Sequence, residues 1–356
     1  MSLSIGIVGL ANVGKSTLFN ALVKESQAEV SNYPFCTIEP NVGIVKVFDS
    51  RLDDLQKILK VPKKIPAPIK FIDIAGLIKG AHKGEGLGNK FLAHIREVDA
   101  ILLVLRAFKD PKITSTQNEI NPQKEFETIK TELVLKDLET VDKKLQNLAK
   151  DIKRGDKLAR IQFDILKKVQ KILNEEKLAR DAGLSDEEKA LIKDLELLTL
   201  KPMMAVLNCD ENDLKNPPFI KQLPEERQIE LAVKTESELA EFSEEEQKEY
   251  LKSLGLGEPG LNRVIRAGFH LLNLISFYTW TKDLVQAWPI PKNTTAQKAA
   301  GIIHTDFQEK FIKAEVLAFE DLKNAKGLDE AKKQGLVRIE GKNYVIQDGD
   351  IVRFVI

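Results

Sequence analysis

The stretch GLANVGKST, from Gly9 to Thr17, could bind a phosphate group. It fits the pattern G-x-x-x-x-G-K-[ST], follows the apolar run LSIGIVG and precedes KSTLFNALVK, whose leucines have helical spacing. Backbone N–H groups at such a strand-to-helix turn form a cradle for an anion. We therefore expect Lys15 to reach the β- and γ-phosphates of a nucleoside triphosphate and the Ser16 hydroxyl to coordinate Mg²⁺.

A second motif, FIDIAG, places Asp73 at the end of another apolar strand, with Gly76 at the spacing D-x-x-G. The Asp73 carboxylate would hold Mg²⁺ through water, and the Gly76 N–H would sense the γ-phosphate. Between the two motifs lies SNYPFCTIEPN, where Thr37 could add a second hydroxyl to Mg²⁺. The predicted catalytic residues are Lys15, Asp73 and Gly76, and the predicted metal ligands are Ser16, Thr37 and Asp73.

The glycine-rich stretch GLIKGAHKGEGLGNKF, residues 76–91, is typical of a switch segment that orders when nucleotide binds. A merely flexible surface loop is the alternative. Leu77 stands where Ras-like enzymes place the glutamine that orients the attacking water, so we expect turnover on the order of 10⁻⁴ to 10⁻² s⁻¹. Asn12 could hold K⁺ between the phosphates, with simple loop packing as the alternative. We expect His82 on the surface rather than as a general base.

A base-reading loop is predicted after the strand MMAVLN. Its tetrapeptide NCDE, residues 208–211, falls where many GTP-binding proteins carry Asn-Lys-x-Asp, so Cys209 replaces the Lys and Glu211 replaces the Asp. Both changes weaken a bidentate guanine clamp. Asn208 or a loop carbonyl could accept from adenine N6, with Cys209 as an apolar wall; Phe108 is either a second wall or core packing. We interpret the site as ATP-preferring, and a GTP-selective loop remains the alternative.

The predicted nucleotide-binding residues are Asn12, Val13, Gly14, Lys15, Ser16, Thr17, Asn208, Cys209 and Glu211.

Composition is that of an ordinary globular protein, since 43% of the 356 residues are hydrophobic and 30% are charged. Lys+Arg and Asp+Glu both total 54, so any nucleic-acid surface must be a local patch. The two cysteines, Cys36 and Cys209, give no disulfide framework. No apolar run approaches the roughly 18 residues of a membrane-spanning helix, and the apolar start lacks a basic region. We expect a cytoplasmic protein with neither a membrane nor DNA as partner.

The order of elements predicts an α/β domain made of residues 1–128 and 200–271, interrupted by a helical arm at 129–199. In the arm, apolar residues from Val134 to Ile152 step by four and three, and a second run from Leu158 to Ile172 follows a turn at Gly155. This pattern predicts an antiparallel helical hairpin. Residues 150–177 hold nine Lys/Arg against five Asp/Glu, which fits either a solvated face or contact with RNA or the ribosome.

Residues 272–356 are predicted to form a compact α+β module. Short strand-like runs surround one small helix, TAQKAAGIIHTDF, and QDGD is expected to be a turn between two alternating strands.

These motifs together resemble the YchF subfamily of Obg-related P-loop GTPases. The resemblance covers essentially the whole chain, including NYPFCTIEPN, DIAGLIKGAHKGEGLGNKFL, NCDE, EPGLNRVIRAGF and AAGIIHTDF. It implies a P-loop NTPase G domain with a coiled-coil arm and a TGS domain of ubiquitin-like β-grasp type. It also implies Mg²⁺-dependent hydrolysis with ATP favoured over GTP, and association with ribosomes.

By motif position, the resemblance implies phosphate contacts at residues 12–17, magnesium ligation by Ser16 and Thr37, and base contact by Asn208 and Cys209. One departure is Ala232 in LAVKT, where family members often carry a small hydroxyl residue.

The sequence therefore predicts a slow ATPase switch that works with the ribosome, its large subunit or RNA. A strict GTPase and a nucleotide-gated scaffold with incidental hydrolysis are the alternatives. No stretch resembles the acceptor-substrate lid of a small-molecule kinase.

Overall fold

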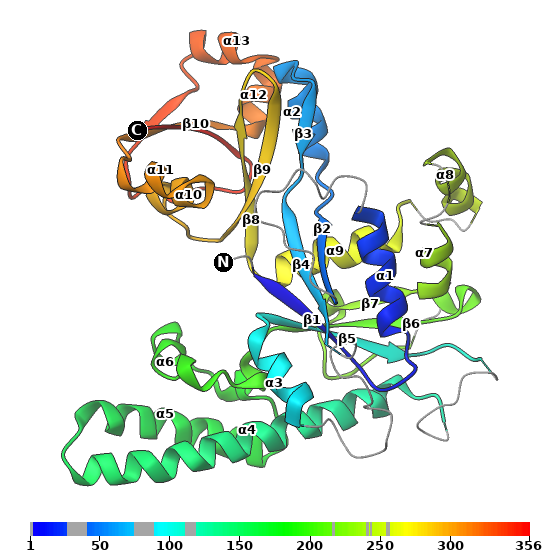
Figure 1. Cartoon of the computed structure of the whole chain (residues 1–356), viewed down its shortest axis with the longest axis vertical. Helices are drawn as coiled ribbons and strands as arrows, with labels where there is room; N and C mark the ends of the chain where they lie inside the picture. The colour runs from blue at the N-terminus through cyan, green and yellow to red at the C-terminus, as the bar shows by residue number, and fades with distance from the viewer. Residues whose placement is uncertain are drawn as a thin grey trace.

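The computed structural model describes residues 3–26, 41–74, 89–110, 119–215, 218–239, 242, 244–253 and 257–356 (Figure 1). Several residues with predicted roles lie outside these ranges: Cys36, Thr37, Gly76, Leu77 and His82. In the part of the chain that is described, no helix is both long and apolar enough to cross a membrane.

The first sheet has six strands in the order β2-β4-β1-β5-β6-β7. Their bounds are β1 Ser4–Val8, β2 Val42–Lys46, β4 Pro68–Asp73, β5 Ala100–Arg106, β6 Met203–Asn208 and β7 Gln228–Leu231. Strands β4, β1, β5, β6 and β7 run parallel, and β1, β5 and β6 are buried along their whole length. The edge strand β2 is antiparallel to β4.

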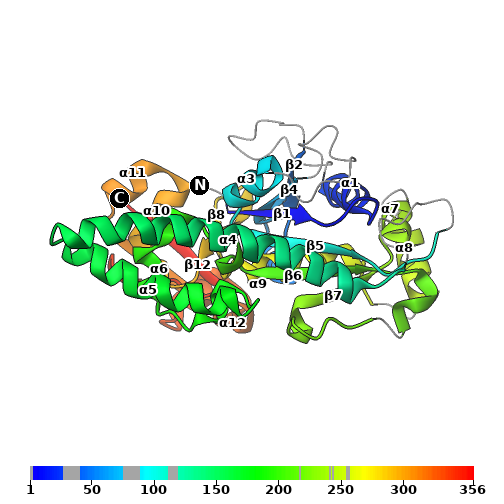
Figure 2. The ribbon, with the colours of Figure 1, turned by 90° about the horizontal axis from the view of Figure 1, so that it is seen from below.

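Helices cover both faces of this sheet, which is why its central strands are apolar throughout (Figures 1 and 2). Helices α1 (Lys15–Ser26) and α9 (Gly260–Leu271) share one core cluster with Ile7 of β1. Helix α3 (Asn89–Glu97) shares a second cluster with Val8. Neighbouring residues of β1 thus face opposite layers, as the pleat of a strand requires.

In the sequence, a helical hairpin is inserted between β5 and β6, and it projects from the sheet (Figure 2). Helix α4 (Pro122–Lys153) meets α5 (Lys157–Asn174) through a turn in which Gly155 has φ 88°. Helix α4 begins before the boundary expected at residue 129, because Asn121 caps it by accepting from the Lys124 N–H at 3.0 Å. One continuous helix therefore packs against the sheet at its beginning and forms part of the arm further on.

The buried seam of the hairpin follows the predicted heptad on α4, where Val141 is fully buried. On α5 the prediction was wrong at the tip: Leu158 is 51% exposed and Ile161 is 52% exposed. Ala159 takes the inward position instead and belongs to the buried cluster of the hairpin. The return to β6 runs through short helices: η2 Ala179–Ala182, α6 Asp186–Leu191, η3 Lys193–Leu195 and η4 Leu198–Leu200.

The second sheet has the order β11-β10-β12-β8-β9-β3 and is antiparallel except at two pairs, β12 with β8 and β3 with β9. Its bounds are β8 Leu274–Trp280, β9 Leu284–Pro291, β10 Lys313–Ala318, β11 Arg338–Glu340, β12 Asp350–Val355 and β3 Lys63–Ile65. Strand β3 comes from the first part of the chain. A segment from the first part of the chain therefore completes the second sheet by backbone pairing with β9, which no sequence pattern indicated.

The sequence predicted too few helices in residues 272–356. Four are present: α10 Ala296–Ile303, α11 Thr305–Glu309, α12 Phe319–Ala325 and α13 Leu328–Lys333. The predicted single helix is split at His304, whose backbone is extended and whose Nδ1 accepts from the Asp306 N–H at 3.2 Å. The α+β character of this region is as expected.

The predicted hairpin at QDGD was also wrong, because only its second strand, β12, forms. The Asp350 carboxylate accepts from the Gln347 N–H at 2.8 Å, which curls the preceding segment. Asp348 is drawn away: it accepts from the Ser276 N–H at 3.0 Å and from Arg51 Nη1 at 2.9 Å. Tertiary partners have replaced cross-strand pairing.

Arg51 lies at the centre of the contact between the two sheets, in helix α2 (Ser50–Leu59). Its guanidinium donates to Asp49 at 2.9 Å and to Asp348 at 2.9 Å, and lies 5.6 Å from the centre of the Tyr278 ring. The Tyr278 hydroxyl also donates to Asp49. Burial alone would raise the pKa of Asp49, but the hydrogen bonds from Arg51 and Tyr278 lower it below its ordinary value.

We expect the substitution Asp49→Asn to destabilise the protein by about 2 kcal/mol at neutral pH, the usual size for hydrogen bonds to a charged group. Asn caps a helix as well as Asp does, so the change removes mainly the charge of the α2 N-cap. The pKa of Asp49 is lower in the folded state than in the unfolded state. The contribution of its charge to the free energy of unfolding is therefore complete above the unfolded pKa of about 3.9 and is lost as pH falls further. Urea unfolding across that range should show the two proteins converging in acid; a constant difference would contradict the assignment.

Candidate functional site

The phosphate loop connects the carboxyl end of β1 to the first turn of α1. Asn12 and Gly14 both adopt left-handed backbone conformations, with φ of 62° and 101°, and the first helical bond runs from the Leu18 N–H to the Gly14 carbonyl at 2.9 Å. Helix α1 therefore begins at Lys15, as the motif predicts. Val13 is 1% exposed and belongs to the core cluster beneath α1, so it anchors the loop, while the side chains of Asn12 and Thr17 are exposed.

The Lys15 side chain is 8% exposed and its Nζ donates to the Leu10 carbonyl at 2.5 Å. Burial lowers the pKa of Lys15, while the charges of Asp73 and Glu125 act in the opposite direction. The ammonium is thus held over its own loop, where the charges of two carboxylates act on it. A phosphate oxygen can replace the loop carbonyl as its acceptor.

Ser16 and Asp73, two of the predicted magnesium ligands, lie side by side. The Ser16 hydroxyl donates to Asp73 Oδ2 at 2.8 Å, and Asp73 is 2% exposed at the end of β4. Hydroxyl and carboxylate oxygens are the donors that Mg²⁺ prefers, and neighbouring oxygens around it are about 3 Å apart. The residues therefore fit this ion. The other predicted ligand, Thr37, lies outside the described residues, as does Gly76.

Asn208 lies at the end of β6 and ties the predicted base loop to the phosphate loop. Its Nδ2 donates to the Val13 carbonyl at 2.9 Å, and its Oδ1 accepts from the Val233 N–H at 3.2 Å. Its side chain is 6% exposed. Asn208 therefore holds together two segments that are far apart in the sequence, and its carbonyl oxygen already has a donor.

Cys209 is buried in the core cluster on the α3 side of the sheet. Its thiol donates to the Leu207 carbonyl at 3.3 Å, and burial raises the pKa of Cys209 to about 12. The side chain is thus neutral and apolar at physiological pH, where a Lys at the same position would bring a charge.

The next two residues of the loop are held by other elements. Asp210 Oδ2 accepts from the Lys109 N–H at 2.9 Å, which joins this loop to the one after β5. Phe108 is half-buried beneath the Arg106 guanidinium, 4.5 Å from its ring centre. Glu211 opens the short helix η5 (Glu211–Lys215) and accepts from hydroxyls on α7 (Val233–Leu239) and α8 (Glu244–Ser253).

Sequence reasoning missed Glu125, which lies in the first turn of α4. Its side chain is 4% exposed and accepts from the Arg106 N–H at 2.9 Å. Burial raises the pKa of Glu125, although Arg106 and Lys15 both lower it. The base of the arm therefore contributes a charge to the surroundings of the phosphate-loop lysine. A Glu at the start of a helix is usual in any protein, so the sequence carried no signal for this role.

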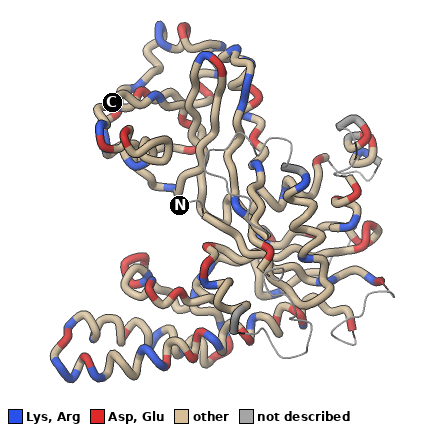
Figure 3. The backbone as a smooth tube through the Cα atoms, in the orientation of Figure 1, with Lys and Arg blue, Asp and Glu red and all other residues tan. Residues whose placement is uncertain are grey.

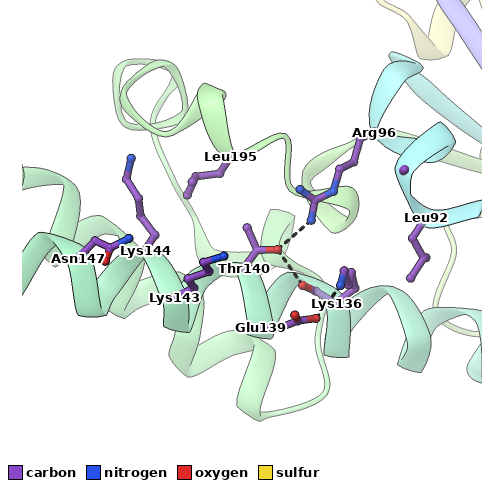
Figure 4. A pocket seen from close by; sticks show the side chains of 10 residues that line it. Leu92, Arg96, Lys136, Glu139, Thr140, Lys143, Lys144, Asn147 and Leu195 are labelled. Atoms are coloured by element: carbon purple, nitrogen blue, oxygen red, sulfur yellow. Dashed lines mark hydrogen bonds and ion pairs between the residues drawn. The ribbon is translucent and has the colours of Figure 1, made fainter. Parts of the chain in front are cut away.

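An open pocket of about 560 Å³ lies elsewhere, between α3 and α4 (Figure 4). Arg96 donates to the Thr140 hydroxyl across it at 2.8 Å. Lys136, Lys143 and Lys144 give the pocket a basic lining. None of the predicted nucleotide-binding residues lines it, so it is a different feature from the phosphate loop.

The parallel sheet, the phosphate loop after β1 and the Ser16–Asp73 pair define a P-loop nucleotide-binding protein. Residues 4–154 match the MMR_HSR1 family model, described as a 50S ribosome-binding GTPase, and residues 274–356 match the YchF-GTPase C-terminal model, described as a protein of unknown function. The chain belongs to the YchF family, because it is 48% identical over 360 residues to the ribosome-binding ATPase YchF of Pasteurella multocida.

Other relatives agree along the full length. The ribosome-binding ATPase YchF of Bacillus subtilis is 46% identical over 363 residues, and both bacterial alignments cover 99% of this chain and 99% of the relative. The solved structure of the Schizosaccharomyces pombe YchF GTPase superposes with a TM-score of 0.91 at 37% identity, covering 99% of this chain and 98% of that one.

Proposed function

We propose that this protein is a nucleotide switch that binds ATP with Mg²⁺, hydrolyses it slowly and acts on the ribosome. The observation that carries the proposal is the convergence of Lys15, Ser16 and Asp73 at the ends of β1 and β4. The relatives named as ribosome-binding ATPases support the same activity and partner.

The phosphates would lie on the backbone N–H groups of residues 12–17, at the amino end of α1, with the Lys15 ammonium between the β- and γ-phosphates. Ser16 and Asp73 would hold the magnesium ion, with Thr37 as the further hydroxyl. When bound, Mg²⁺ neutralises charge that develops on the phosphate oxygens. Asn12 is exposed on the loop, where its side-chain oxygen could hold K⁺ beside the phosphates.

Slow hydrolysis is expected because the sequence has Leu77 where Ras-like enzymes place the water-orienting glutamine. Leu77 cannot orient water, and we assign no general base. The chain's own contribution is to position the triphosphate and to supply positive charge from Lys15, while the Gly76 N–H senses the γ-phosphate. Such a protein spends most of its cycle bound to ATP and depends on a partner to turn over.

A preference for adenine is supported by Cys209 and Glu211, which stand where many GTP-binding proteins carry the Lys and the Asp that bind guanine. Cys209 brings no charge to the base loop, and the Asn208 carbonyl oxygen already accepts from Val233. The Asn208 oxygen is thus taken for either base, so the preference rests on Cys209 and Glu211, which replace the Lys and the Asp of the guanine clamp; unpaired buried donors of guanine would lower its affinity.

Ribosome contact is proposed for the tip of the arm. Lys153, Arg154, Lys157 and Arg160 are exposed there beside Leu158 and Ile161. Charges of both signs are spread along the rest of the arm (Figure 3). A local cluster of cations suits the phosphates of ribosomal RNA, and its binding would weaken steeply with salt.

Calorimetry with ATP and GTP in the presence of Mg²⁺ tests the proposal on the purified protein. We expect tighter binding of ATP, loss of that affinity when Mg²⁺ is chelated, and co-sedimentation with ribosomes that weakens when Lys157 and Arg160 are both changed to Glu. Changing Lys332 and Lys333 of α13 to Glu is the matched control. A hundredfold preference for GTP would show a strict GTPase, and ribosome binding that survives Lys15→Ala without response to nucleotide would show a scaffold.

A further inference from the structure

The Glu211 carboxylate is held by two hydroxyl groups from separate helices. Thr235 Oγ1 of α7 lies 3.4 Å from Glu211 Oε2, and the Tyr250 hydroxyl of α8 lies 3.2 Å from the same oxygen. Tyr250 is itself placed by Phe242, whose ring meets it edge-on at 6.4 Å. Both contacts end on one oxygen of the carboxylate.

Glu211 stands in the part of the site where a purine would be read. It follows the carboxyl end of β6 in the same short loop as Asn208, which contacts the phosphate loop directly. In open α/β sheets, ligands bind outside the carboxyl ends of the strands. A base attached to phosphates on α1 would therefore approach this loop.

The two oxygens of the Glu211 carboxylate differ in how many further hydrogen bonds they can accept from a base. A carboxylate oxygen has two lone pairs, so two hydroxyl donors use the acceptor capacity of Oε2. Among the described residues, none donates to Oε1. Within the described part of the chain, Oε1 is thus the oxygen of Glu211 that remains available to a base.

Guanine and adenine place different demands on such a group. Guanine presents N1–H and N2–H₂ side by side, and a carboxylate satisfies both only by offering one oxygen to each. Adenine presents a single donor group, N6–H₂, beside the N1 acceptor. One available oxygen meets the need of adenine and leaves a guanine donor unpaired, which costs affinity.

We propose that Thr235 and Tyr250 are positioning residues that set base selectivity by occupying Glu211 Oε2. They act through Glu211 and exclude guanine by withdrawing the second acceptor of the clamp. The proposal rests on the proposed ATP-binding function and deepens it, because it assigns the selectivity to two residues outside the Asn-x-x-Glu loop.

The test is competition binding of ATP, GTP and ITP to the full chain carrying Thr235→Val and Tyr250→Phe. Both substitutions keep the shape of the side chain and remove its hydroxyl, and Phe keeps the ring contact with Phe242. We expect the affinity for GTP relative to ATP to rise roughly tenfold, the usual worth of one hydrogen bond to a charged group. ITP should gain less than GTP, because it has N1–H but lacks the 2-amino group.

The matched control is Tyr344→Phe, which removes a tyrosine hydroxyl bonded to Asp350 at 2.8 Å in the second sheet. It should leave the ratio of GTP to ATP affinity unchanged. A structural role for Tyr250 alone would weaken all three nucleotides equally, so an unchanged ratio in the double variant overturns the inference. The single variant Tyr250→Phe gives the same reading if the double variant does not fold.

The adenine preference of the protein and the role of Thr235 and Tyr250 can be contradicted separately. If the unmodified protein binds GTP more tightly than ATP, the proposed adenine preference is wrong whatever the variants do. If the unmodified protein prefers ATP and the variants keep that preference within about twofold, only the role of Thr235 and Tyr250 is wrong.

Discussion

Replacing Gly14 with alanine should raise the dissociation constant for ATP by at least a hundredfold while the protein stays folded. Gly14 has φ 101°, a conformation that strains an L-residue by about 1–3 kcal/mol, and its new Cβ would lie 2.5 Å from Asn208 Nδ2. Asn208 cannot move away easily, because Val13 and Val233 bind it from both sides. The loop must therefore shift, and the backbone N–H groups no longer converge on a phosphate.

The matched control for this change is Gly341→Ala, because a Cβ at Gly341 meets no atom within 4 Å and its backbone is not left-handed. Binding of a fluorescent ATP analogue measures both variants, and thermal unfolding shows that each is folded. Gly341→Ala should bind as the unmodified protein does. Wild-type affinity in Gly14→Ala would mean that the loop conformation does not determine binding.

The phosphate loop could be predicted from the sequence because its chemistry is local. Gly14, Lys15 and Ser16 are neighbours, and a strand before them and a helix after them suffice to define the cradle. The place of Asp73 followed from the same logic, since parallel strands end at one edge of the sheet. The contact between Ser16 and Asp73 agrees with that prediction.

The base loop could be predicted only in part. The Asn208 position follows from the end of β6, but its commitment to Val13 and Val233 depends on how three segments come together. Thr235 and Tyr250 gave no signal at all, because a hydroxyl on an ordinary helix has no spacing that marks it as a partner of Glu211. Residues that act through another side chain have no motif of their own.

The errors in the second sheet have the same cause. The segment QDGD has good local propensity for a hairpin, but Arg51 and the Ser276 N–H draw Asp348 into the contact with α2. At the tip of the arm, Leu158 fits the apolar spacing, yet Ala159 is the residue that is buried in the cluster with α4. In both places a tertiary contact decides the structure, because the local preference for the predicted conformation over its alternatives is small in energy.

The change Asp137→Asn should lower the stability of the arm by about 3–4 kcal/mol, the largest effect on folding that we expect from a single polar substitution. Asp137 of α4 is 0% exposed and accepts from the N–H groups of Leu198 and Thr199, at 2.8 and 2.7 Å. The Thr199 hydroxyl adds a third donor at 2.6 Å. An Asn would turn its NH₂ group toward at least one of these donors. Two donors would then face each other, and neither would have an acceptor.

The damage should be local, because Asp137 fastens the return segment before β6 to the middle of α4. Hydrogen exchange should show faster exchange of the Leu198 and Thr199 amides, while the β1 and β5 amides remain protected. Asp164→Asn on the exposed face of α5 is the matched control, since the Asp164 side chain is 60% exposed and its ion pair with Arg160, at 3.4 Å, lies on the surface. If Asp137→Asn leaves those two amides as protected as Asp164→Asn does, the buried carboxylate does not hold the return segment to α4.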